Sequence, residues 1–525
     1  MMVPSRRQLL ATVLWSFVLL AAAEGKVHHH TWDIAYRYKS PDCFEKIVVT
    51  INGEFPGPTI RATQGDTVVV TVNNHLETEN TGIHWHGIRQ IGSPWADGTV
   101  GVTQCPILPG ETFTYRFVVD RPGTYDEEHT VLLMDWWHKS VYEQAVGLAS
   151  DPLVFVNEPQ SLLINGRGRF NCSSVAAGAG CNASSPECSL PTLFTAVPGK
   201  TYRLRIGSLT SLSSLNFEIQ GHSMTVVEAD GHYVNPVRVD SLFVYSGETY
   251  SVLVTADQDP SMSYWAASHV VGRERKTPSG LAVLRYAHNH SGPPRTLPPA
   301  GPAWNDTAPR MQQSRSIVAH PAHVEVPPAR PDRELLLLNT QNRINNRVKW
   351  AINGVSLTFP PTPFLVSMKR GMYNNQQPPE TYDYRSYDIA SPPAINGTVA
   401  SAAYRLGLGS VVDVVLQNTV ALNGKSETHP WHLHGHDFWV LAYGDGKFDP
   451  DKDAAKFNLR DPVMKNTVAL HPMGWTAVRF RADNPGVWLF HCHIEAHVYM
   501  GMGVVFEEGI DKVGRLPKAI MGCRF

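Results

Sequence analysis

The sequence has few charged residues, and neither sign of charge dominates. Asp, Glu, Lys and Arg make up 18% of the 525 residues, and the net charge at pH 7 is −2. A dedicated nucleic-acid-binding or membrane-surface protein usually carries a strong excess of basic residues. The balance of charge therefore argues against both functions.

Long amphipathic helical patterns are also absent. Short runs of Val, Ile, Thr, Tyr and Phe alternate instead with turn clusters, and the chain has 41 glycines and 39 prolines. This pattern is typical of an all-β protein. The length exceeds what one hydrophobic core usually covers, so two to four domains are expected.

The sequence has one long apolar run, at its start. Arg6 and Arg7 precede "LLATVLWSFVLLAAA", which ends in small residues before Glu24. Residues 1–23 are predicted to be a cleaved signal peptide; the alternative, a membrane anchor, is disfavoured because the run is short for a span. We expect a secreted mature chain outside the membrane. Five Asn-x-Ser/Thr sequons fit that compartment as glycosylation sites: Asn171, Asn182, Asn289, Asn305 and Asn396.

Cysteines are few and odd in number. Of the seven, Cys492 alone lies between two histidines, and it is predicted to stay unpaired. The other six are expected to form disulfides, but their spacing does not determine the pairing: Cys43, Cys105, Cys172, Cys181, Cys188 and Cys523.

Internal repeats indicate three copies of one unit. "HWHG" at residues 84–87 recurs as "HLHG" at 432–435, and "FEIQGHSMTVVEADG" from Phe217 aligns with "WHLHGHDFWVLAYGDG" from Trp431 without its histidines. Three β-sandwiches, the middle one lacking ligands, explain the pattern. We expect domains at 24–125, 126–331 and 332–525, with a Pro-rich linker at 292–332.

The segment "HCHIEAHVYMGM" predicts metal binding. In an extended strand successive side chains point to opposite faces, so His491 and His493 share one face and Cys492 takes the other. His497 and Met502 follow on a loop that can fold back toward Cys492. A thiolate, two imidazoles and a weak thioether form the ligand set of a blue copper site.

The second imidazole for this site is expected from "HPWHLHGH". His429 can project to the face of Cys492, while His432 and His434 share the other face with His491 and His493. His84 and His86 of the first unit can meet them across a domain interface, which predicts a cluster that holds several copper ions. Zinc is the alternative metal, but the methionine and the two-sided strand disfavour it.

These residues resemble the multicopper oxidases and, among them, the plant ascorbate oxidases. The resemblance covers nearly all of the mature chain and is carried by "ETHPWHLHGHDFWVL", "FHCHIEAHVYMGMGVVF", "HWHGI", "LLINGRGRFNCS" and "WAINGVSLTFPPTP". It implies three cupredoxin-like Greek-key sandwiches, with His429, Cys492, His497 and Met502 at a type 1 copper. It assigns the remaining histidines to a trinuclear site: His84 and His432 at type 2, and His86, His434, His491 and His493 at type 3.

The resemblance also implies disulfides, a reaction and a partner molecule. The pairs are Cys43 with Cys188, Cys105 with Cys523, and Cys172 with Cys181. The reaction is one-electron oxidation of an ascorbate-like enediol or phenol at type 1, with electrons passing through Cys492, His491 and His493 to reduce O2 to water. The resemblance implies secretion to the plant apoplast or cell wall. It is also compatible with a homodimer.

Four residues near the type 1 copper are expected to bind the reductant or to tune a copper ligand. Trp350 and Phe155 match two aromatics that hold the reductant in the family beside His497, although Trp350 could equally be an ordinary core tryptophan. The phenylalanine weakens the case for ascorbate itself. Glu427 is expected either to tune His429 or simply to be solvated.

One family feature is absent from the first domain. "RFVVDRPGTYDEEHT" approaches its end as "RFRADNPGVWLFHCH" does, but it puts Glu128, His129 and Thr130 where the later copy has ligands. The resemblance implies that about thirty residues, or two strands with their connections, are absent between Tyr125 and Asp126. Asp126, Glu127 and Glu128 are then the start of the second domain, and His129 is the one residue here that could stray toward the copper cluster.

The gap predicts a truncated first sandwich with exposed apolar surface, and a trinuclear site with six of eight histidines. Two hypotheses follow from it. The first is an ascorbate-oxidase-type enzyme, impaired or not, that needs a small reductant and O2. The second is a secreted, non-catalytic or weakly active copper-binding glycoprotein.

Overall fold

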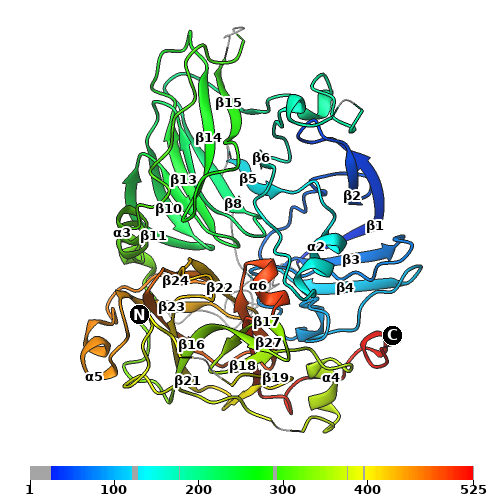
Figure 1. Cartoon of the computed structure of the whole chain (residues 1–525), viewed down its shortest axis with the longest axis vertical. Coiled ribbons are helices and arrows are strands. Elements are labelled where there is room, and N and C mark those ends of the chain that lie inside the picture. Colours follow the sequence, from blue (N-terminus) through cyan, green and yellow to red (C-terminus); the bar gives the residue numbers. More distant parts are fainter. Residues whose placement is uncertain are drawn as a thin grey trace, which may run out of the picture.

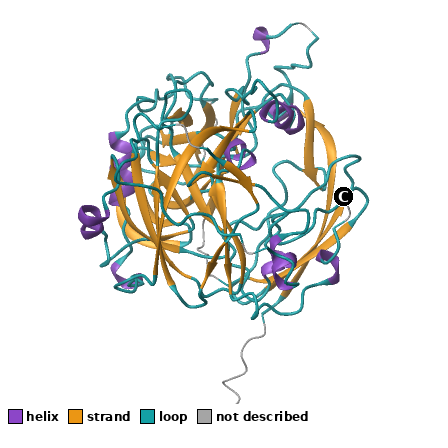
Figure 2. Ribbon diagram, turned by 60° about the horizontal axis from the view of Figure 1, so that its bottom comes forward, coloured by secondary structure: helices purple, strands orange, loops and turns teal. Residues whose placement is uncertain are grey.

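A computed structural model describes residues 25–120, 128–176, 178–287, 292–374, 376–393 and 396–523. Strands dominate it, and the few helices are short and lie mostly at the periphery (Figure 2). The predicted all-β sandwich class is confirmed. The predicted signal peptide, Asn289, and residues 121–127 with the proposed gap lie outside the described residues.

The first unit forms one sheet at the right of Figure 1. Its strand order is β2-β1-β3-β4, with β1 parallel to β3 and the other pairs antiparallel. The rest of residues 25–120 contributes a short helix and isolated bridges. The bounds are β1 (Val27–Lys39), β2 (Lys46–Ile51), β3 (Thr67–Asn74), η1 (Pro94–Ala96) and β4 (Thr112–Val118).

The inner face of this sheet is covered by the third unit. Val70, Val72 and Tyr115 are fully buried in a core that also contains Phe364 and Leu489. The prediction of an exposed apolar surface is therefore wrong for this face, because side chains from the C-terminal third of the chain pack where a second sheet would lie. Among the described residues, one edge of β4 pairs with no other strand of the sheet, as the prediction of an unpaired edge expected.

The second unit is a sandwich of two sheets with orders β11-β10-β13-β8-β5-β6 and β12-β9-β14-β15-β7. Alternating buried and exposed residues, as in β13, turn one face of each strand to the shared core. Its strands are β5 (Glu128–Trp136), β6 (Ser161–Ile164), β7 (Thr192–Ala196), β8 (Thr201–Ser208), β9 (Ser214–Ile219), β10 (Met224–Ala229), β11 (His232–Val239), β12 (Leu242–Val244), β13 (Thr249–Thr255), β14 (Tyr264–Val271) and β15 (Gly280–Tyr286). Its helices are α2 (Val141–Leu148), η2 (Cys172–Ser174) and η3 (Pro186–Cys188).

The predicted linker contains ordered helices. Within residues 292–332 the chain forms α3 (Ala308–Ser316) and η4 (Pro321–His323). The Gln313 amide exchanges two hydrogen bonds with the backbone of Phe243, and Arg310 reaches the Thr428 hydroxyl. The segment therefore ties the second unit to the third, which its proline content did not reveal.

The third unit is a larger sandwich whose sheets have the orders β19-β18-β17-β16-β21-β26-β23-β24 and β20-β28-β27-β22-β25. Its strands are β16 (Arg333–Ile344), β17 (Arg347–Ile352), β18 (Val355–Leu357), β19 (Thr398–Ala400), β20 (Tyr404–Leu406), β21 (Val411–Gln417), β22 (His429–Leu433), β23 (Phe438–Asp445), β24 (Met464–Lys465), β25 (Thr467–Leu470), β26 (Gly474–Arg481), β27 (Gly486–Cys492) and β28 (Gly503–Glu508). Its helices are α4 (Phe364–Lys369), α5 (Pro450–Asp453), η5 (Ala454–Lys456), α6 (Glu495–Tyr499) and η6 (Lys518–Ile520).

Disulfides connect the three units as predicted. Cys43–Cys188 joins the first unit to the second, and Cys105–Cys523 joins the first to the C-terminal segment. Cys172–Cys181 closes a short surface loop, and Cys492 is free and buried. The cross-links resist separation of the units in an oxidising compartment.

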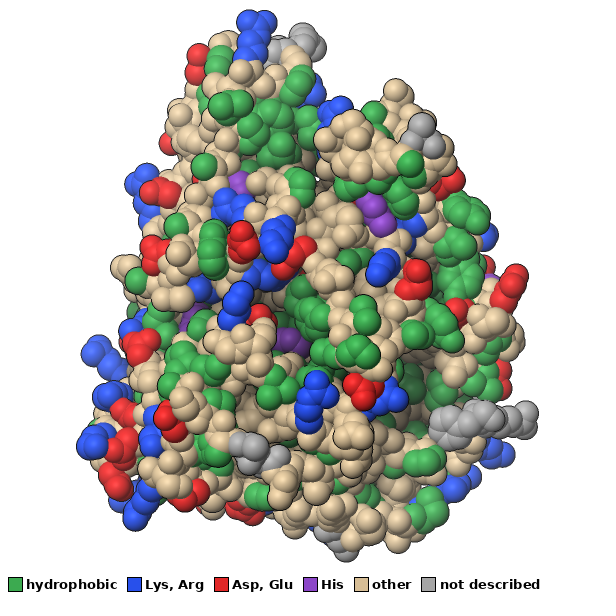
Figure 3. Space-filling model, in the orientation of Figure 1, with side chains coloured by type: hydrophobic (Ala, Val, Ile, Leu, Met, Phe, Trp, Pro, Cys, Tyr) green, Lys and Arg blue, Asp and Glu red, His purple; other side chains and the backbone are tan. Residues whose placement is uncertain are grey.

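The surface fits the balanced composition. Acidic and basic side chains are interspersed over the face drawn in Figure 3. Four predicted sequon asparagines are exposed: Asn171, Asn182, Asn305 and Asn396. In the part of the chain that the structure describes, no helix is both long and apolar enough to cross a membrane.

Candidate copper centres

Two paired strands, β22 and β27, supply four of the ten candidate ligands: His429, His432, His491 and Cys492. β22 and β27 lie near the meeting point of the three units (Figure 1), where His432 pairs with His491 and Trp431 with Cys492. Directly paired residues point to the same side of a sheet. The pairing thus places the two histidines on one face and the cysteine on the other, as strand parity predicted.

The first candidate site surrounds Cys492. Its Sγ lies 3.7 Å from Nδ1 of His429 and 3.7 Å from Nδ1 of His497. All three residues are buried. Met502 is fully buried, and its backbone bonds both the Cys492 N–H and the His497 carbonyl, so the loop folds back over the site as predicted.

The donor set of this site suits a soft metal ion. Burial lowers the pKa of His429 to about 3 and that of His497 well below its usual value, so both imidazoles are neutral at pH 7. Burial raises the pKa of the Cys492 thiol. The thiol therefore keeps its proton until a metal displaces it, as expected of a thiolate ligand in an apolar site.

The predicted reductant-binding residues border this site. The Trp350 ring lies 5.0 Å from that of His429 and 4.9 Å from that of His497, and Phe155 lies 6.5 Å from His497. Trp350 is 3% exposed, so its ring packs on the imidazoles rather than lining an open surface.

Glu427 acts on the site through its charge. The carboxylate lies near Arg273 and Glu158, and burial raises its pKa. Its charge adds to the burial that raises the pKa of Cys492. The charge of Glu427 therefore acts on Cys492, whereas burial alone lowers the pKa of His429.

The second candidate site contains the six other histidines that are predicted to bind copper. His84 stacks on His434 with ring centroids 4.0 Å apart, and His86 stacks on His432 at 3.9 Å. The shortest ring distance from His491 is 5.1 Å to His434, and that from His493 is 5.0 Å to His86. Residues from the first and third units therefore form one cluster, as the repeats predicted.

The ring nitrogens of this cluster divide into two sets. Nδ1 of His84, His432 and His491 each faces a backbone carbonyl oxygen, at 2.9, 2.9 and 3.0 Å. Such contacts place the proton on Nδ1 and leave the Nε2 lone pair free. Nε2 of His84, His86 and His432 is buried without a hydrogen-bond partner in the described structure.

One contact shows most directly that a cation fits between these rings. Nε2 of His434 lies 3.1 Å from Nε2 of His491, while Nδ1 of each ring already has an acceptor. Two lone pairs that face each other at this distance repel unless a cation lies between them. Imidazole nitrogens with supported partner atoms are the ligands that copper prefers.

Asp97 supports the cluster and was not predicted from the sequence. Its Oδ2 accepts from His434 Nδ1 at 3.0 Å and from Thr99 Oγ1 at 2.7 Å, and its backbone oxygen accepts from His84. Burial raises the pKa of Asp97, but the charges and hydrogen bonds of His434 and His84 outweigh burial, so the pKa lies well below its usual value. Asp97 is thus a buried carboxylate that orients two ligands, 337 residues from one of them in sequence.

We expect Asp97→Asn to weaken the histidine cluster while leaving the Cys492 site intact. The amide keeps the shape and the backbone acceptor of His84, but it removes the charged acceptor of His434. Such partner changes typically cost about 10 to 100-fold in metal affinity or activity. Copper atoms per chain and the visible band of the Cys492 site measure the two effects separately.

Asp42→Asn is the matched control, because Asp42 is a fully buried carboxylate that accepts from His138 at 2.8 Å away from the candidate ligands. Equal copper loss in the two variants would contradict a specific role for Asp97.

His129 does not join the cluster. It lies in β5, where its ring stacks on Phe194 at 4.7 Å inside the second unit. The neighbouring Glu128 accepts from Arg205 at 2.6 Å. Both residues therefore belong to the sandwich of the second unit.

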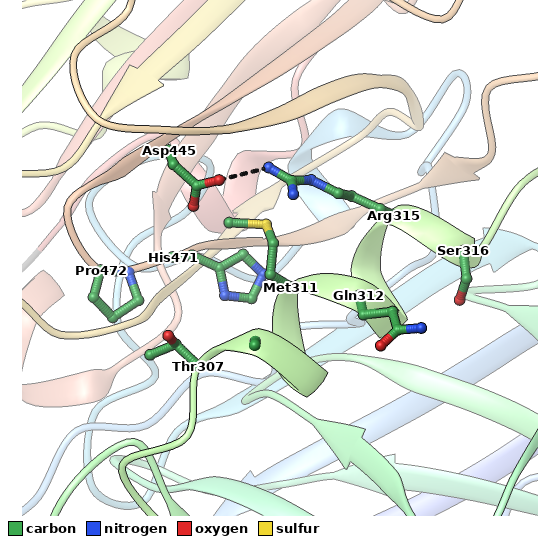
Figure 4. Close-up of a pocket in the computed structure, with 9 residues that line it drawn as sticks. Thr307, Met311, Gln312, Arg315, Ser316, Asp445, His471 and Pro472 are labelled. Atoms are coloured by element: carbon green, nitrogen blue, oxygen red, sulfur yellow. Dashed lines mark hydrogen bonds and ion pairs between the residues drawn. The ribbon is translucent and has the colours of Figure 1, made fainter.

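A separate pocket of about 540 Å³ lies beside α3 (Figure 4). Arg315 pairs with Asp445 at 3.0 Å across it, and His471 forms its inner wall. His471 hydrogen-bonds to Ser314 at 2.9 Å. None of the predicted copper ligands lines this pocket.

Comparisons with known proteins agree with the fold. Three sequence models described as multicopper oxidase match residues 33–156, 127–289 and 358–512. A laccase structure from Botrytis aclada superposes with a TM-score of 0.77 at 28% identity, covering 94% of this chain and 89% of that one. The chain belongs to the multicopper oxidase family, whose cofactor is copper.

Its relatives define a narrower group within the family. The L-ascorbate oxidase of Cucumis sativus is 49% identical over an alignment of 559 positions, which covers 98% of this chain and 95% of that protein. The L-ascorbate oxidase of Nicotiana tabacum is 47% identical over 95% and 93% of the two chains, whereas Laccase-2 of rice is 33% identical. The chain is an ascorbate-oxidase-type multicopper oxidase, a copper-dependent oxidoreductase.

Proposed function

We propose that this protein oxidises L-ascorbate, or a similar enediol or phenol, by single electrons at the Cys492 site, and that it reduces O2 to water at the histidine cluster. Four one-electron oxidations and four protons balance each O2 converted to two waters. When bound, copper at the first site accepts single electrons, and copper at the second takes O2 through its reduction. The names of the plant relatives support ascorbate as the reductant.

One observation carries this proposal. Cys492, the centre of the first site, is covalently flanked by His491 and His493, which lie in the second cluster. An electron that enters at the thiolate therefore reaches the second site through the backbone of adjacent residues. His429 and His497 hold the entry side, and Trp350 shields it from water.

We propose further that the second site has two histidines fewer than the family provides. The alignment with the cucumber protein spans 559 positions, whereas this chain has 525 residues, so at least 34 of those positions are gaps on this side. A loss of about thirty residues between Tyr125 and Asp126 accounts for most of them. The single four-stranded sheet of the first unit, beside two two-sheet sandwiches, fits such a loss.

The gap supports a second candidate function, a secreted copper-binding glycoprotein with little or no oxidase activity. It would keep type 1 copper, because all four ligands of that site lie in the third unit, and it would lack complete type 2 and type 3 sites. Secretion to the apoplast or cell wall applies to both candidates, and the exposed sequons support it.

Anaerobic addition of ascorbate to the copper-loaded protein tests the first step. We expect the blue band to bleach, because the reduced type 1 ion has lost its charge-transfer transition. A parallel titration with a phenol such as hydroquinone compares the two reductant classes. Bleaching by neither reductant would rule out electron entry at Cys492, and bleaching by the phenol alone would exclude ascorbate as the substrate.

A further inference from the structure

The second unit supplies none of the predicted copper ligands, yet one of its turns contacts two of them. Residues 245–248 connect β12 to β13, and the Glu248 N–H closes the turn on the Tyr245 carbonyl at 3.0 Å. The turn is fixed to its own domain by a second hydrogen bond, from Gly247 N–H to the Ser208 carbonyl at 3.0 Å. Its tip is therefore rigid where it meets the cluster.

Ser246 makes the closest of these contacts. Its Oγ lies 2.9 Å from Nδ1 of His493, and it also contacts the carbonyl oxygens of Thr210 and His493. A hydroxyl has one proton, and carbonyl oxygens can only accept. The hydroxyl proton is therefore used by the carbonyl oxygens, and Oγ accepts from Nδ1–H of His493. This arrangement leaves the Nε2 lone pair of His493 free for a metal ion.

Gly247 holds the same ring from its face. A Cβ at this position would lie 2.8 Å from Cδ2 of His493, and the residue has φ +83°, so glycine is needed for both reasons. Its backbone also forms a hydrogen bond with His86. The turn therefore touches one histidine from the third unit and one from the first.

A buried ionic cluster fastens the turn to the third unit. Lys465 Nζ lies 3.2 Å from Glu248 Oε1 and 3.5 Å from Asp230 Oδ2, and all three side chains are buried. Asp230 accepts from the N–H of Asn466, whose carbonyl accepts from Nδ1 of His432. The same cluster thus connects the turn to a third histidine.

We propose that Ser246 is a positioning residue of the histidine cluster, which fixes the Nδ1–H tautomer and the orientation of His493. The second unit then completes the copper site without donating a ligand. This role rests on the proposed function of the cluster, but the tautomer itself does not depend on copper.

Ser246→Ala tests the role in the full, copper-loaded chain. We expect about 10 to 100-fold weaker retention of copper by the histidine cluster against a chelator, because the ring loses its acceptor. The visible band of the Cys492 site should persist and report folding. Ser251→Ala is the matched control, since Ser251 is a buried hydroxyl on β13 that donates to Glu228 at 2.8 Å. Equal copper retention in the Ser246 variant and the wild type would overturn the proposal.

A second measurement needs no variant of Ser246. In metal-free protein labelled with ¹⁵N-histidine, ring nitrogen shifts show which nitrogen carries the proton, and His493→Gln assigns the signal. We expect the proton of His493 on Nδ1; a proton on Nε2 would refute the role even if Ser246→Ala fails to fold. A wild-type chain that binds no copper would instead refute the proposed function, while the tautomer would still decide the role of Ser246.

Discussion

Cys492→Ser is expected to abolish the strong visible absorption of the copper-loaded protein. The band arises from charge transfer between a thiolate and copper, and Cys492 is the one free cysteine among the described residues. A serine hydroxyl neither ionises near pH 7 nor donates as a soft ligand. The two imidazoles 3.7 Å from Sγ would remain, so copper could still bind weakly without the colour.

The measurement is the visible spectrum per bound copper, compared with that of a Cys172→Ser/Cys181→Ser control. The control also removes sulfur, but from a surface disulfide outside the candidate sites, so its band should be unchanged. Colour that survives in the Cys492 variant, or a colourless wild-type holoprotein, would contradict the assignment.

The sequence predicted those parts of the site that depend on local geometry. Alternation along β27 separates Cys492 from His491 and His493, and the same rule separates His429 from His432 on β22. Spacing within a few residues therefore indicated which side chains share a face. The third unit contains both strands, which is why its copper site could be outlined without a structure.

Residues that support the ligands could not be found this way. Asp97 lies 337 residues from His434, and Ser246 lies 247 residues from His493. Neither residue belongs to a repeated motif, and an aspartate or a serine in a turn usually has only a local role. Their function follows from how the domains dock, which depends on the summed packing of three units.

Domain docking also explains why the first unit differs from its prediction. Counting strands indicated an uncovered apolar face, but Val70 and Val72 of that face are buried in one core with Phe364 and Leu489 of the third unit. Burial depends on what lies opposite a strand, and a distant segment can supply it. The proposed gap is therefore expected to harm the chemistry of the protein more than its folding.

The largest expected effect on turnover comes from the two histidines that the proposed gap removes. We expect the chain as written to accept electrons from ascorbate, which bleaches the blue band, but to reoxidise in air far more slowly than a derivative with a restored segment. The restored segment is a family-like insert of about thirty residues between Tyr125 and Asp126 that contains one His-x-His pair. Loss of two imidazoles that bind the metal directly should exceed the roughly 10 to 100-fold cost of changing a supporting residue.

The measurement is oxygen uptake per type 1 copper, together with copper atoms per chain. The matched control is the same insert with both histidines changed to alanine, because it restores the strands without the ligands. We expect turnover and copper content to recover together in the first insert and to stay low in the second. Recovery in both would mean that the strands matter and the imidazoles do not.

Rapid turnover by the unmodified chain would show that another residue completes the coordination. His129 is the nearest histidine in sequence to the gap, but its ring stacks on Phe194 within the second unit and would have to leave that core to reach copper. His129→Ala separates the two explanations. If it lowers oxygen uptake of the unmodified chain, the second unit rearranges to supply a ligand; if uptake is slow and unaffected, the six histidines already in place are the whole set and the missing pair limits the reaction.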